Sequence, residues 1–60
     1  MNEVDLTPLL SEALYEVQKH YKIDVNLEGE LLSFGFFEPE AMLYFSETML
    51  RLISELRDSN

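Results

Sequence analysis

The stretch KIDVNLEGELLSFGF, residues 22–36, decides the fold. Large apolar residues alternate with polar ones up to Leu27, and the alternation resumes after Glu28-Gly29. A period of two is typical of strands that are buried on one face. Gly29 can supply the positive φ that a tight turn needs. The stretch therefore predicts a β-hairpin with strands at about residues 22–27 and 31–36.

A two-residue loop at Glu28-Gly29 gives the hairpin a definite register. The predicted pairs are Leu27 with Glu30, Val25 with Leu32, Ile23 with Phe34, and Tyr21 with Phe36. A four-residue loop from Leu27 to Glu30 preserves the same pairing. The large apolar residues then share one face, whereas a slip of one residue would mix the two faces.

A helix is predicted before the hairpin, over about residues 8–20. Thr7 is a favoured N-cap, and Pro8 suits the first helical position, where no amide donor is needed. The apolar residues that follow recur at helical spacing on one face: Leu9, Leu10, Ala13, Leu14, Val17 and Tyr21. Before this helix, residues 1–6 form a short acidic lead without periodicity.

A second helix is predicted after the hairpin, over about residues 39–57. Pro39 fits its first position, and Glu38 and Glu40 suit the positive end of the helix dipole. Its main apolar stripe consists of Ala41, Met42, Phe45, Met49, Leu52, Ile53 and Leu56. We therefore expect one α+β domain over residues 1–60, a helix–β-hairpin–helix (αββα) with both helices packed on one face of the hairpin.

Length and composition predict that this domain associates with itself. A chain of 60 residues has a small core, and such chains usually rely on disulfides, a metal or oligomerisation. The sequence has no cysteine and one histidine, which leaves oligomerisation. A hairpin also has two open edges. We expect a homodimer in which two hairpins form a four-stranded sheet.

Several apolar residues fall outside the predicted core and are candidates for an interface with a second copy or another partner. Leu43 and Leu50 are seven residues apart on one line of the second helix. Leu31 and Phe37 point to the polar side of the hairpin, and Tyr44 projects from a polar helix face. The predicted interface is therefore Leu31, Phe37, Leu43, Tyr44 and Leu50.

The sequence predicts a binding protein rather than an enzyme. It has no Gly-rich phosphate loop, no Cys/His pair and no metal signature, so we expect no catalytic, cofactor or metal site. Glu16 and His20 are four residues apart, but two groups on one helix are too few for a metal site. Asp24, Asn26, Glu28 and Glu30 alternate as calcium ligands do, yet the strand pleat already explains that alternation.

Charge is the most unusual property of the chain. Twelve Asp and Glu oppose four Lys and Arg, which gives a net charge of −8. A field of this sign repels nucleic acid and favours basic protein surfaces, although it also keeps a small protein soluble. The candidate partner-binding carboxylates are Glu12, Glu16, Asp24, Glu28, Glu30, Glu38, Glu40 and Glu47. With an acidic start and no long apolar run, we expect a cytoplasmic protein without a membrane span.

These features favour a small acidic protein that modulates or inhibits a protein partner by stoichiometric binding. Compact acidic proteins of phages and mobile elements often block host enzymes or defence systems, and the analogy here is one of size and charge alone. A DNA mimic that occupies a nucleic-acid-binding groove is one alternative. A homodimeric adaptor without an inhibitory role is another.

Overall fold

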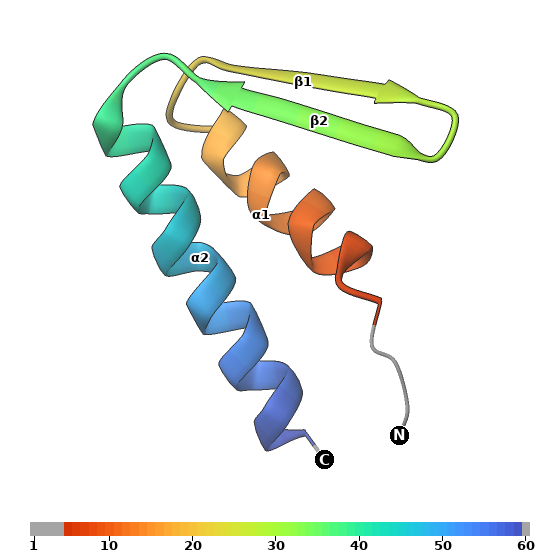
Figure 1. Cartoon of the computed structure of the whole chain (residues 1–60). Coiled ribbons are helices and arrows are strands. Elements are labelled where there is room, and N and C mark those ends of the chain that lie inside the picture. Colours follow the sequence, from red (N-terminus) through yellow and green to blue (C-terminus); the bar gives the residue numbers. More distant parts are fainter. Residues whose placement is uncertain (1–4, 60) are drawn as a thin grey trace.

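A computed structural model describes residues 5–59 of the chain. The elements are helix α1 (Thr7–Gln18), strand β1 (Ile23–Glu28), strand β2 (Leu31–Phe36) and helix α2 (Pro39–Asp58). The order helix, antiparallel hairpin, helix confirms the predicted α+β architecture. Both helices lie on the same side of the hairpin (Figure 1), with β1 nearer α1 and β2 nearer α2. Most of the predicted acidic lead, residues 1–4, lies outside the described part, as does Asn60.

The start of α1 differs from the prediction by one residue. Thr7 is already helical, and the amide of Leu10 donates to the carbonyl oxygen of Leu6. The side chain that satisfies a free amide at this end is Asp5, whose Oδ1 accepts from the backbone N–H of Thr7 at 3.0 Å. Acidic side chains accept such bonds more strongly than hydroxyls because they carry charge. Asp5 therefore takes the capping role that the sequence suggested for Thr7.

The register of the hairpin also differs, by two residues. The observed pairs are Ile23–Phe36, Asp24–Gly35, Val25–Phe34, Asn26–Ser33, Leu27–Leu32 and Glu28–Leu31. The two-residue loop is Gly29-Glu30 rather than Glu28-Gly29. Gly29 has φ +61°, while Glu30 has a negative φ. A type II′ turn asks for glycine at its first central position, and this preference decides the register. A shift of two leaves the same residues on the apolar face, so the predicted faces hold.

The buried core lies between the two helices. Its apolar members are Ala13, Leu14, Val17, Ala41 and Leu52. Thr48 is buried with them, and its hydroxyl donates to the carbonyl oxygen of Tyr44 at 2.8 Å, which satisfies it within its own helix. The small side chains of Ala13 and Ala41 let the helices approach closely. The sequence pattern missed Thr48 because threonine is not counted as apolar.

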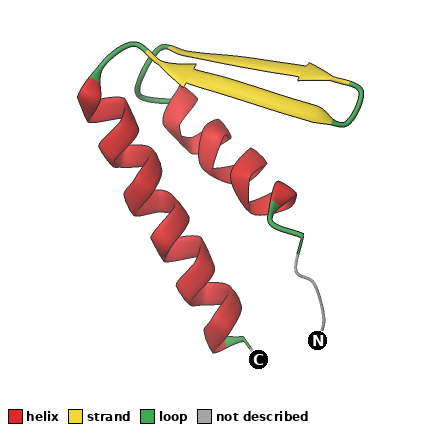
Figure 2. Ribbon diagram, in the orientation of Figure 1, coloured by secondary structure: helices red, strands yellow, loops and turns green. Residues whose placement is uncertain are grey.

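The hairpin is held to the helices at its base. Phe45 of α2 packs on Phe34 and Phe36, with ring centroids 5.3 Å apart in each pair. Further from this contact the same face of the hairpin is open, and Leu27 near the turn is exposed. Figure 2 shows the two strands diverging from α1 towards the turn. Within residues 5–59, no third strand pairs with either edge of this sheet.

Three of the seven residues in the predicted apolar stripe of α2 are exposed. Ala41 and Leu52 are in the core, as expected, but Met42, Ile53 and Leu56 remain exposed. Met42 and Ile53 lie on the side of α2 that faces away from the core, and Leu56 lies near the end of α2, which has 20 residues against 12 in α1 and extends beyond it. The chain exposes 4930 Å². A compact protein of 7.0 kDa is expected to expose about 4,000 Å².

The turn geometry leads to a test with two glycine variants. A Cβ at either Gly29 or Gly35 would meet no atom within 4 Å, but only Gly29 has a positive φ. We expect Gly29→Ala to lower the free energy of unfolding by about 1–2 kcal/mol, the cost of a left-handed conformation for an L-residue. Gly35→Ala should be neutral or stabilising by about 0.5 kcal/mol. Urea unfolding of both variants measures the difference, and equal losses would contradict the assigned turn.

Candidate interaction surface

The tip of the hairpin combines uncompensated negative charge with exposed leucines. Asp24 and Glu28 lie on the outer face of β1, and Glu30 lies in the turn. No Lys or Arg occurs between Ile23 and Phe36, so these three carboxylates are the only charged side chains of the hairpin. Leu27 and Leu31 flank the turn and are both exposed. We refer to Leu27, Glu28, Glu30 and Leu31 as the acidic hairpin tip; Asp24, which pairs with Gly35, lies nearer the base of the hairpin.

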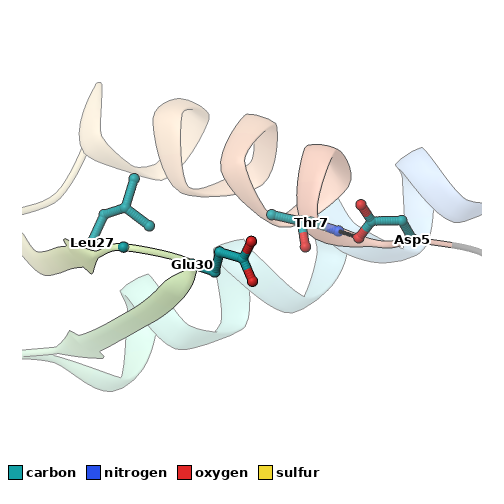
Figure 3. A pocket seen from close by; sticks show the side chains of 5 residues that line it. Asp5, Thr7, Leu27 and Glu30 are labelled. Atoms are coloured by element: carbon teal, nitrogen blue, oxygen red, sulfur yellow. Dashed lines mark hydrogen bonds between the residues drawn. The ribbon is translucent and has the colours of Figure 1, made fainter.

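A hollow of about 490 Å³ separates this tip from the start of α1. Asp5, Thr7, Leu27, Gly29 and Glu30 line it. Figure 3 shows the Leu27 side chain pointing towards α1, and the Glu30 carboxylate facing the segment that carries Asp5 and Thr7. The hollow thus has an apolar wall on one side and carboxylates at its mouth. Such a site suits a basic or mixed basic and apolar side chain.

Asp5 is committed to the helix rather than to a ligand. The Asp5 carboxylate accepts a hydrogen bond from the backbone N–H of Thr7. This bond holds the pKa of the Asp5 carboxyl below its ordinary value of 3.8. The residue was absent from the sequence-based candidates. An acidic residue two positions before a helix start is the signal that identifies it.

The basic side chains of the described chain are all engaged close to their own positions in sequence. Lys19 pairs with Glu16 at 3.1 Å and lies over the ring of Tyr15. Lys22 lies over the ring of Phe37. Arg51 pairs with Glu55 and Arg57 with Asp58. Within residues 5–59, the following predicted carboxylates have no cationic partner: Glu12, Asp24, Glu28, Glu30, Glu38, Glu40 and Glu47.

The structure leaves four of the five predicted interface residues exposed. Leu31 lies at the hairpin tip, Phe37 in the β2–α2 connection, and Leu43 and Leu50 on one side of α2. They belong to different surfaces and do not form one patch. Tyr44 differs from the rest, because it is half-buried and packs against the rings of His20 and Tyr21.

His20 is part of this aromatic contact and not of a Glu16–His20 pair. Its ring lies 5.1 Å from that of Tyr44, and Glu16 is bonded to Lys19 instead. The neighbouring Tyr21 has a pKa raised above its ordinary value of 10.0, first by desolvation and then by the negative charges of Glu40 and Glu38. A second hollow, of about 300 Å³, lies beside this contact and is lined by Tyr44, Glu47, Thr48 and Arg51.

No group of three or more His, Cys, Asp or Glu side chains in residues 5–59 is arranged to hold a metal ion. The hydroxyls of Ser46 and Ser59 donate to the carbonyl oxygens of Met42 and Leu56, respectively. In the same part of the chain, neither helix has the length and apolar character needed to cross a bilayer.

Comparison with family models, curated proteins and solved structures gave no match to this chain. What the chain binds is therefore inferred from its own surfaces, and above all from the acidic hairpin tip.

The Asp5 cap predicts a pH-dependent contribution to stability. Because the pKa of Asp5 is lowered in the folded chain, its contribution is present above pH 3.8 and is lost as pH falls through the lowered value. Asp5→Ala should therefore be less stable than the parent at neutral pH and equal to it at strongly acidic pH. Asp5→Asn, which retains an acceptor oxygen, is the control and should lie between them. Thermal unfolding across pH tests this, and a deficit of Asp5→Ala that persists unchanged in acid would contradict it.

The environment of Tyr21 predicts that its phenol loses its proton at a higher pH than an ordinary tyrosine. Its raised pKa means that the unfolded chain loses the phenol proton first, so stability falls as pH rises beyond 10.0. Glu40→Gln should lower the pKa of Tyr21, whereas Glu47→Gln removes the same charge elsewhere on α2 and should leave it unchanged. NMR titration of the tyrosine rings measures both. A Tyr21 pKa at or below the ordinary value in the parent protein would contradict the assignment.

Proposed function

We propose that this chain works by stoichiometric binding to a protein with a basic surface, and that the acidic hairpin tip makes the contact. The observation that carries the proposal is the charge distribution of the hairpin. Glu28 and Glu30 have no cationic partner and lie with two exposed leucines at the turn end of the hairpin, and Asp24 adds a third unpaired carboxylate on the outer face of β1.

Charge and apolar area contribute differently to such a contact. The carboxylates attract a basic partner over about 8–10 Å at physiological ionic strength and raise the association rate. Leu27 and Leu31 supply apolar area that is removed from water once contact is made. The hollow beneath the tip can receive a side chain that projects from the partner. Together these features support recognition of a surface on which basic and apolar residues are mixed.

The same surface favours modulation of a protein partner as the function. A small rigid body that covers a basic site on another protein blocks whatever that site normally binds. DNA mimicry is a special case of this mechanism. The unpaired carboxylates occupy α1, the hairpin, the β2–α2 connection and α2 rather than one continuous line, so the distribution favours general protein recognition.

The first experiment identifies a partner and measures how binding depends on charge. The immobilised chain is used to capture proteins from a cell extract, and the purified partner is then titrated with the parent protein. We expect a one-to-one complex per protomer whose affinity falls as salt is raised. The variant Asp24→Asn/Glu28→Gln/Glu30→Gln should bind about tenfold more weakly, which corresponds to about 1.4 kcal/mol.

A matched variant separates the effect of removing charge at the hairpin from the effect of lowering the net charge. Glu16→Gln/Glu55→Gln/Asp58→Asn also neutralises three carboxylates, so both triple variants change the net charge from −8 to −5. The second set is ion-paired on the helices and is distant from the hairpin tip in sequence. It should bind nearly as well as the parent. Equal weakening by both variants, or an affinity that does not change with salt, would refute the proposal.

A further inference from the structure

A second surface of the molecule has the opposite character from the hairpin tip. Four apolar residues on the side of α2 away from the core are exposed by between 41% and 69%. They are Met42, Leu43, Leu50 and Ile53, and we call them the outer strip of α2. With Ser46 and Arg57 they occupy about 100° of the helical wheel. No carboxylate lies within this arc, and the four acidic residues of α2 are grouped on one side of it, within about 80° of the wheel.

From this strip we propose that two copies of the chain associate through α2, packed antiparallel about a two-fold axis near Leu50. The inference goes beyond the proposed function and does not depend on it. Charge argues for a second copy as the occupant. A basic partner would gain nothing from a surface without carboxylates, whereas two chains of net charge −8 can meet there without bringing carboxylates together.

The residue spacing of the strip suits packing against the α2 helix of a second copy. Leu43, Ser46, Leu50, Ile53 and Arg57 follow each other at intervals of three and four residues, which is the spacing of a helix–helix seam. Ser46, in the middle of the strip, is small, and its hydroxyl already donates to the carbonyl oxygen of Met42 at 3.1 Å. It can therefore enter a dry contact without leaving a polar group unsatisfied, and it permits close approach.

The charges along α2 decide the orientation. Its first half, with the preceding cap residue, carries Glu38, Glu40 and Glu47 and no basic residue. In its second half, Arg51 and Arg57 balance Glu55 and Asp58. A parallel pair would place two acidic halves together, whereas an antiparallel pair places each acidic half beside a neutral one that contains arginine. Antiparallel packing also opposes the two helix dipoles.

The available area sets the expected strength. The four residues of the strip expose roughly 400 Å² per copy, against about 800 Å² per partner in an interface of standard size. The dimer should therefore be weak and should dissociate in the micromolar range. Salt should strengthen it by screening the repulsion between two acidic chains, which is the opposite of its effect on binding to a basic partner.

Sedimentation equilibrium of the chain alone tests the proposal with two matched variants. Leu50 and Leu31 are 69% and 67% exposed, so replacing either by glutamate adds the same charge at equal burial. Leu50→Glu should raise the dimer dissociation constant at least about tenfold, and Leu31→Glu less than about twofold. Circular dichroism establishes that both remain folded. A mass of 7.0 kDa for the parent up to about 100 μM, or equal effects of the two variants, would overturn the proposal.

Single cysteines locate the contact, because the native chain has none. In the antiparallel arrangement Leu50→Cys forms a disulfide between copies under oxidation. Leu43→Cys does not, since the two positions lie about 21 Å apart along the helix axis. Efficient cross-linking of Leu43→Cys would refute the antiparallel orientation. Cross-linking of Ser33→Cys in its place would mean that the edges of β2 meet, as in the four-stranded sheet expected from the sequence, and would refute the α2 contact.

Discussion

The contact between α1 and α2 is the interaction on which the rest of the structure depends. It contains all five of the buried apolar side chains found in residues 5–59. The hairpin is attached at its base, where its Phe34 and Phe36 pack on Phe45 of α2. A helix of 12 residues is about 18 Å long and cannot cover one of 20 residues, which is about 30 Å long. The hairpin tip and the outer side of α2 are open for a different reason, because none of the described elements packs on them.

Those surfaces differ in the physics of what they can bind. The hairpin tip carries like charges that repel a second copy and attract a basic protein. The outer strip of α2 carries no carboxylate. Its apolar area is removed from water only when another apolar surface covers it. A dimer through α2 leaves both hairpin tips free and places them at opposite ends. Such a dimer would present two binding sites for a partner, and linked sites bind a paired target more tightly than single ones.

Much of the fold could be predicted from the sequence because its local signals agree with each other. The change from helical to alternating periodicity located the hairpin, and Pro8 and Pro39 marked both helix starts to within a residue. The register was predicted wrongly because Glu28-Gly29 and Gly29-Glu30 are both two-residue loops with the same faces. Only the preference of glycine for the first position of a type II′ turn separates them. Asp5 was missed as the cap because Thr7 offered a plausible one beside Pro8.

The candidate surfaces were harder to predict than the elements. Periodicity shows which face of a helix is apolar, but not how much of that face a neighbour covers. Met42 and Ile53 were therefore placed in the core, and Leu27 on a buried strand face, although all three are exposed. The charges of the hairpin were visible in the sequence as residues. Their lack of cationic partners became clear only from the positions of Lys19, Lys22, Arg51 and Arg57.

The most direct test of this division of surfaces is an isotope-filtered NOE experiment on a mixture of labelled and unlabelled chain at high concentration. Contacts between copies should involve the methyl groups of Leu43, Leu50 and Ile53 and should leave Leu27 and Leu31 without any. Contacts between copies that involve the hairpin leucines, or no contacts at all, would contradict the account.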